Sequence, residues 1–148
     1  MYEAIYNLKH NRKKRFTLVE LIVVLVILAI LLAILVPSMT SWITKAKEKQ
    51  VLINARTVYL ACQTVASEEY AKATPGYTAD TAIALTAAPT GTGLDMQVEH
   101  LAALNSSVKW TGSFTVNASG QVSVFSYVQN GITISLNTTN NDLEKTAG

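Results

Sequence analysis

A long run of apolar residues lies near the N-terminus of the chain. Residues 21–43 carry no ionisable side chain, and residues 21–36 are all apolar. At a rise of about 1.5 Å per residue, about 20 residues cross the hydrocarbon layer of a bilayer. A core helix of a soluble protein needs only one apolar face, whereas this run is apolar on every face. The pattern therefore predicts a membrane-spanning helix.

After this run, apolar residues recur at helical spacing, which predicts an amphipathic helix. These positions are Ala46, Val51, Ala55, Val58, Cys62, Val65 and Ala66. No glycine or proline lies between Ser38 and Pro75. We therefore expect one continuous helix of roughly sixty residues, or about 85 Å, that stops at Pro75-Gly76. Because Cys62 lies on the apolar stripe, we expect a packed thiol rather than a reactive one.

Charged residues gather at the start of the amphipathic part. They are Lys45, Lys47, Glu48, Lys49 and Arg56. Such residues most often form a solvated face, since exposed ion pairs contribute little to stability. The alternative is that the group at residues 45–49 contacts acidic lipid or a neighbouring subunit.

The segment after the long helix has a mixed character. Residues 77–93 are rich in Thr and Ala, which predicts a connecting loop with at most short structure. Residues 94–105 predict a short helix that Asp95 can cap. Its apolar residues on or near one face are Leu94, Val98, Leu101 and Leu104. We expect His100 to be a surface or partly packed residue rather than a metal ligand, because the other histidine lies near the N-terminus.

From residue 108 onward the hydrophobic period changes to two, which predicts strands at residues 109–117, 121–129 and 132–137. Asn130-Gly131 is a strong signal for a two-residue hairpin turn. We therefore expect an α+β fold, in which a long N-terminal helix is packed in its outer half by a small antiparallel β-meander head. The tail, residues 137–148, is polar and expected to be mobile.

Composition and charge narrow the class of protein. The chain has 148 residues, with 12 basic and 10 acidic side chains and a single Cys. A disulfide within the chain is thereby excluded, and nothing in the sequence resembles a metal cluster or a nucleophilic triad. We therefore expect no cofactor and no enzymatic activity. Residues 16–148 have a net charge of −2 and lack a basic stripe with interleaved aromatics, so no nucleic-acid partner is expected.

The basic cluster immediately before the apolar run sets its orientation. Residues 10–15 read HNRKKR, and clustered basic residues stay in the cytoplasm. The N-terminus should therefore be cytoplasmic, in a single-pass topology with the C-terminal part outside.

Two residues disturb this otherwise simple anchor. Glu20 lies at the cytoplasmic end of the run, where a carboxylate inside lipid costs roughly 3 kcal/mol. Either it stays at headgroup level near the helix N-terminus, or it pairs with a cation supplied by another molecule in the membrane. Pro37 should kink or locally melt the helix. This either produces a bend near the outer boundary or gives a soft point where the helix can adapt within an assembly.

Together these residues carry a family resemblance. The basic leader ending in KKR, the sequence FTLVE at residues 16–20, and an apolar helix with Pro37 resemble the N-terminus of a type IV prepilin or pseudopilin. The resemblance implies that a membrane peptidase cleaves between Arg15 and Phe16 and that the new terminal Phe16 is N-methylated. It also implies that Glu20 pairs with the α-ammonium group of Phe16 on a neighbouring subunit, which fixes the register between helices.

The chain departs from the family at one position, because Arg15 stands where the family has Gly. Either the peptidase accepts Arg, or the recorded sequence differs from the native precursor, or the protein stays uncleaved in the membrane.

The resemblance implies a structural subunit of a type IV pilus filament, stored in the cytoplasmic membrane and then assembled into an extracellular pilus. Its expected partners are copies of itself in a helical homopolymer, the prepilin peptidase, the pilus assembly platform and, before assembly, membrane lipid. The expected segments are a leader (1–15), a transmembrane and polymerisation half-helix (16–37), an amphipathic half-helix (38–74) and the head (75–148). The alternatives are a pseudopilin of a secretion or DNA-uptake machine and an uncleaved, membrane-anchored binding module.

Overall fold

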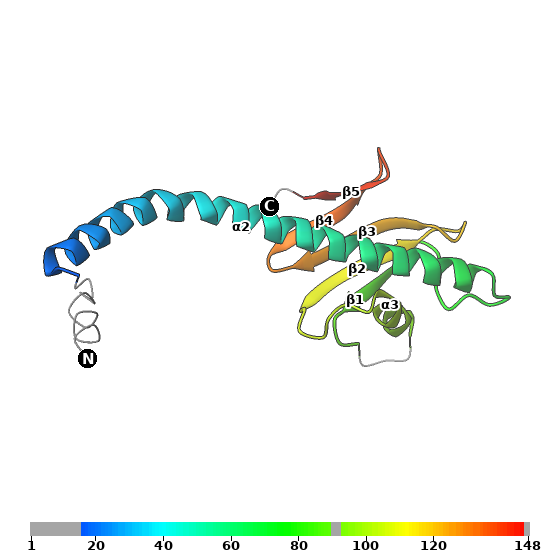
Figure 1. Ribbon diagram of the computed structural model, residues 1–148. Helices are drawn as coiled ribbons and strands as arrows, with labels where there is room; N and C mark the ends of the chain where they lie inside the picture. Colours follow the sequence, from blue (N-terminus) through cyan, green and yellow to red (C-terminus); the bar gives the residue numbers. More distant parts are fainter. Residues whose placement is uncertain (1–15, 90–92, 147–148) are drawn as a thin grey trace, which may run out of the picture. The chain divides into compact units, whose positions relative to one another are not determined.

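The computed structural model describes residues 16–89 and 93–146. Its elements, in chain order, are helix α2 (Leu18–Tyr70), strand β1 (Ala82–Thr86), helix α3 (Leu94–Ala102) and strands β2 (Trp110–Val116), β3 (Val122–Gln129), β4 (Ile132–Asn137) and β5 (Asp142–Lys145) (Figure 1). A long apolar helix followed by an antiparallel sheet confirms the predicted α+β class. The chain divides into two compact units between Ile43 and Thr44.

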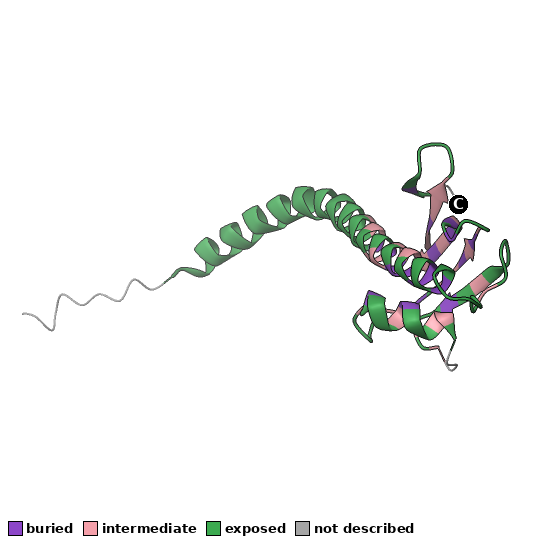
Figure 2. Ribbon diagram, turned by 90° about the vertical axis from the view of Figure 1, so that its right-hand side faces the viewer, coloured by how far each residue is buried: buried purple, intermediate pink, exposed green. Residues whose placement is uncertain are grey.

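In the first unit, α2 is exposed on every side. The large apolar side chains from Leu18 to Val36 are 45% to 73% exposed, and the helix is coloured as exposed throughout this part in Figure 2. By length and composition this helix could cross a membrane. The predicted apolar helix is therefore present, and in this structure none of its faces is covered.

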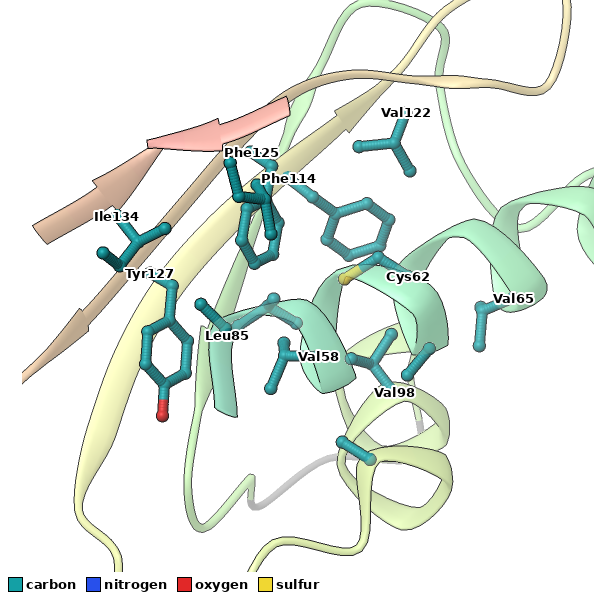
Figure 3. Packing of buried hydrophobic residues seen from close by; sticks show 14 of the residues in the cluster. Val58, Cys62, Val65, Leu85, Val98, Phe114, Val122, Phe125, Tyr127 and Ile134 are labelled. Atoms are coloured by element: carbon teal, nitrogen blue, oxygen red, sulfur yellow. The ribbon is translucent and has the colours of Figure 1, made fainter. Parts of the chain in front are cut away.

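In the second unit, one stripe of α2 packs against one face of the sheet. The buried residues of the helix are Val51, Ala55, Val58, Ala61, Cys62, Val65, Ala66 and Glu69. Phe114 and Phe125 of the sheet lie close to Cys62 in this core (Figure 3). The predicted stripe is confirmed except at Ala46, which is exposed because it lies more than a turn before Val51, the first buried position.

Cys62 is fully buried, as predicted for a packed thiol. Burial raises the pKa of this thiol well above its usual range, because the thiolate would lose its hydration. The side chain therefore acts as a small apolar group of the core.

The strands form one antiparallel sheet in the order β1-β2-β3-β4-β5. Strands β2, β3 and β4 are the predicted meander. In the β3–β4 turn, Asn130 and Gly131 have φ angles of 53° and 76°, the positive values that an Asn-Gly hairpin turn requires. The predicted loop at residues 77–93 also contains β1, which pairs with β2 from Ala82↔Thr115 to Thr86↔Thr111.

The prediction of a mobile tail is wrong. Strand β5 pairs with β4, and Leu143 is only 6% exposed. This strand is also tied to α2, because Arg56 Nη2 lies 3.1 Å from Asp142 Oδ1 and Lys145 Nζ lies 2.7 Å from Glu48 Oε1. Arg56 stays exposed and Glu48 partly exposed, in keeping with the predicted solvated face, and both also form ion pairs with β5. Burial of one leucine and the ladder hydrogen bonds offset the entropy lost when the polar tail is ordered.

Helix α3 differs from its prediction in two respects. The N-cap residue is Gly93 rather than Asp95, and no side chain caps the helix. Leu101 is 48% exposed, whereas Val98 and Ala102 are buried, because these two residues face the core. His100 is exposed and lies at the surface, in keeping with its prediction.

A buried carboxylate fixes the end of α2, which stops at Tyr70 rather than at Pro75-Gly76. The Glu69 side chain is only 4% exposed and pairs with the Lys72 ammonium group. It also accepts a hydrogen bond from the Gly76 backbone N–H, with 2.9 Å between N and Oε2. A Cβ at Gly76 would lie 2.9 Å from the same oxygen, so glycine allows this close approach.

The hydrogen bond from Lys72 and then the one from Gly76 hold the pKa of Glu69 below its usual value. Since the folded state favours the ionised form, Glu69 stabilises the head above the unfolded Glu pKa of about 4.3. This contribution is lost as the pH falls through the lowered folded pKa.

We predict that Glu69→Gln lowers the melting temperature of the full chain in detergent at pH 7 and reduces its acid sensitivity. Glu68→Gln is the matched control, because Glu68 is the exposed neighbour of Glu69. Thermal unfolding followed by circular dichroism at pH 7 and at about pH 3 checks both effects. An equal loss of melting temperature on acidification in wild type and Glu69→Gln would contradict the assigned role.

Candidate functional site

The candidate site lies where α2 begins. Thr17 precedes the first helical residue, and its Oγ1 accepts a hydrogen bond from the Glu20 backbone N–H at 3.2 Å. The Thr17 carbonyl accepts from the Leu21 N–H, also at 3.2 Å. Thr17 is therefore the N-cap of the helix, with Glu20 three positions later. We did not identify this cap from the sequence, although Thr-x-x-Glu before an apolar run is a known capping pattern.

The cap places Glu20 in the first helical turn. Its backbone N–H is used by Thr17, but no residue of the described ranges donates a hydrogen bond to its carboxylate or forms an ion pair with it. A negative charge in the first turn interacts favourably with the helix dipole. The carboxylate can thus meet a cation from outside this chain, and both interpretations of Glu20 stay predictions.

Phe16 directly precedes the capped helix and is 70% exposed. The apolar side chains that follow it are also exposed, and burying one Leu, Ile or Val side chain is worth about 1.5–3 kcal/mol. Summed over the helix, this surface strongly favours insertion into lipid or packing against other apolar helices.

Pro37 lies inside α2, and the helix continues through it. The predicted local melting therefore does not occur in this structure. Polar side chains after Pro37 bond to carbonyls within the helix: Thr40 Oγ1 donates to the Pro37 carbonyl at 2.8 Å, and Ser41 Oγ donates to the Ser38 carbonyl at 3.1 Å. These internal bonds satisfy the hydroxyl donors, which allows the segment to enter apolar surroundings.

In the second unit, α2 also carries an exposed stripe of apolar and hydroxyl side chains. Ile53 and Leu60 are each 63% exposed. Thr57 lies between these two residues, and its hydroxyl donates to the Ile53 carbonyl at 3.1 Å. Thr64 follows Leu60, and its hydroxyl donates to the Leu60 carbonyl at 2.9 Å. The spacing of four, three and four residues keeps this stripe on one side of the helix, away from the buried stripe.

Comparison with known families decides how the N-terminal segment is classified. Residues 12–36 match the family model of the prokaryotic N-terminal methylation motif. The chain carries the leader signature of type IV pilins and pseudopilins. This confirms the resemblance drawn from the basic leader and FTLVE, and it indicates a pilin-like or pseudopilin-like protein of a family of structural subunits.

The methylation motif covers the start of the helix and ends before Pro37, so it does not extend to the head. No curated protein and no solved structure matches the chain. Of the residues singled out by the sequence, Phe16 and Glu20 lie within the motif and on either side of the Thr17 cap. Arg15 also lies within the motif but falls outside the residues that the structure describes.

The second unit contains a small polar network between its helix and its sheet. Among residues 16–89 and 93–146, no three His, Cys, Asp or Glu side chains are grouped so as to hold a metal ion. Tyr127 donates to Gln129 Oε1 at 2.7 Å, and Asn54 Nδ2 donates to the same oxygen at 2.9 Å. Burial raises the pKa of Tyr127 to about 12, so its hydroxyl stays protonated at neutral pH. This small network links the helix to the sheet.

We predict that Thr17→Ala frays the first turn of α2, because the Glu20 N–H loses its side-chain acceptor. Loss of an N-cap costs about 1 kcal/mol, which corresponds to roughly fivefold faster amide exchange. Hydrogen exchange at residues 18–21 of the full chain in micelles measures the change. Thr17→Ser keeps the hydroxyl and should exchange like wild type. Equal exchange in all three proteins would show that Thr17 does not cap the helix.

Proposed function

We propose that the protein is a structural subunit of a type IV pilus filament, assembled from the cytoplasmic membrane after removal of residues 1–15. The observation that carries this proposal is the helical part of the methylation motif, residues 18–36, which is apolar and exposed on every side. Such a surface suits two environments in succession. It can be held by lipid before assembly and packed against identical helices afterwards.

Assembly in this way exchanges one apolar environment for another. Helices that leave the bilayer lose lipid contacts and gain contacts with neighbouring helices, so the apolar surface stays out of water. Contacts between different patches on successive copies do not close on themselves and give an open helical filament. The stripe with Ile53 and Leu60 would pack against neighbouring subunits farther along the helix.

Glu20 has a specific role in this mechanism. Cleavage before Phe16 creates an α-ammonium group, and the carboxylate of a neighbouring subunit can neutralise it in the apolar centre of the filament. Each charge then offsets the desolvation cost of the other, and the pair fixes the axial register of adjacent helices. Pro37 supplies the point at which the helix adapts to its neighbours. The heads face outward and provide surface properties such as adhesion.

Two alternatives are retained. A pseudopilin would use the same N-terminus in a short fibre of a secretion or DNA-uptake machine, and filament length separates it from a pilus. An uncleaved membrane-anchored module is favoured if Arg15 blocks the peptidase.

We predict that the chain purified from its native host begins at Phe16 and is one methyl group heavier than the mass calculated for residues 16–148. Intact mass spectrometry with N-terminal sequencing measures both properties. A protein produced in a host without the peptidase is the control and should keep Met1. If the native protein also keeps residues 1–15, the anchored module replaces the filament subunit as the proposed function.

We also predict that Glu20→Ala and Glu20→Gln both reduce filament yield by roughly a hundredfold, because each leaves the Phe16 ammonium group buried without its counter-charge. Both variants should insert into membranes normally, as membrane flotation would show. Electron microscopy and quantification of sheared filaments measure assembly. Normal filament yield from the Gln variant would mean that the charge of Glu20 is dispensable.

A further inference from the structure

The second unit contains a pocket of about 230 Å³ near the start of its part of α2. Three elements of the second unit contribute to it, namely α2, β4 and β5. Its lining residues are Lys45, Glu48, Lys49, Leu52, Ile132, Ile134 and Lys145.

This pocket combines two kinds of surface. Its polar lining has three ammonium groups and one carboxylate, so its net charge is positive. That carboxylate, on Glu48, lies 2.7 Å from the Lys145 ammonium group. Within the described ranges, no carboxylate lies within ion-pair distance of Lys49. The remaining lining is aliphatic and includes Ile134, which is 1% exposed.

The position of Lys45 and Lys49 along α2 gives the depth of these two lysines in a membrane. Residues 21–43 lack ionisable side chains and, as a helix, would extend about 35 Å, slightly more than the roughly 30 Å hydrocarbon layer. Lys45 and Lys49 follow this run by two and six residues in the same helix. They therefore fall at the level of the lipid headgroups, on the side opposite to the basic leader.

We propose that this pocket binds the phosphate group of an anionic phospholipid, with Lys45, Lys49 and Lys145 around the phosphate. A membrane lipid is the expected source of this phosphate, because Lys45 and Lys49 lie where lipid phosphates are concentrated, and Leu52, farther from the apolar run, can contact the carbon atoms of a glycerol headgroup. A free anion would use the ammonium groups but leave the aliphatic surface wet. This inference rests on the membrane-stored state of the proposed function, and it assigns that state a specific lipid contact.

The full-length, uncleaved chain is reconstituted in phosphatidylcholine nanodiscs that contain a minor fraction of phosphatidylglycerol. Native mass spectrometry then counts the phosphatidylglycerol retained on the released protein. We expect one retained molecule on wild type and about fivefold less retention on Lys49→Gln, the effect of one lysine at an anionic membrane surface.

Lys47→Gln is the matched control. Lys47 lies at the same depth and carries the same charge, but it does not line the pocket. Its variant should retain lipid like wild type. Leu52→Trp fills the pocket without changing the charge and should lose retention like Lys49→Gln. Circular dichroism of each variant verifies that the head is folded.

Several outcomes would overturn the proposal. If Lys47→Gln and Lys49→Gln lose equal amounts of retained phosphatidylglycerol, the lysines attract lipid diffusely at the membrane surface and form no site. Displacement of the lipid by inorganic phosphate as effectively as by glycerophosphoglycerol would indicate a free-anion site. A dimer whose formation is prevented by Leu52→Trp would indicate that a second copy occupies the pocket, and absence of retained lipid on wild type would remove the site altogether.

The experiment separates this inference from the filament proposal. If the wild-type protein floats together with the lipid, the protein is inserted in the membrane. Retention of phosphatidylglycerol requires neither cleavage of the chain nor its assembly into filaments. Filaments formed by a protein that retains no phosphatidylglycerol would refute the lipid site alone. Retained lipid on a protein that never forms filaments would refute the filament proposal alone.

Discussion

The rest of this structure depends on how the apolar surface of α2 is kept out of water. In the first unit every face of α2 is apolar and exposed, whereas in the second unit the same helix has only a narrow apolar stripe buried by the sheet. The composition of this one helix thus changes along its length, from a part suited to apolar surroundings to a part suited to water. The capped first turn, the internally bonded hydroxyls after Pro37 and the lysines that begin at Lys45 all fit this division.

Much of the fold could be predicted because its signals are local. An uninterrupted apolar run, a stripe at helical spacing and an Asn-Gly turn between alternating strands each determine their element within a few residues. Strands β1 and β5 could not be predicted in this way. The Ala/Thr-rich segment of β1 and the polar segment of β5 have little strand preference of their own, and pairing with β2 and β4 decides their conformation.

The candidate site shows the same distinction. Phe16, Glu20 and Pro37 are recognisable because they belong to one contiguous pattern, and Thr17 could have been added from its spacing to Glu20. Contacts between distant parts of the chain could not be foreseen. Glu48 and Lys145 are 97 residues apart, and nothing near either residue indicates that they meet. The same holds for Glu69, whose burial depends on how the chain turns back at Gly76.

The way the tail is held affects where the protein can be modified. Strand β5 closes one edge of the sheet and is tied to α2 by two ion pairs, so a peptide fused behind it would be attached to a structural strand. The β3–β4 turn has open space around it, because a Cβ added at Gly131 would meet no heavy atom within 4 Å, but the φ of 76° at Gly131 strains any other residue there. A graft of a foreign epitope or a fluorescent label at this hairpin would therefore have to keep Asn130-Gly131 in place, and a graft next to β5 would have to keep its two ion pairs with α2.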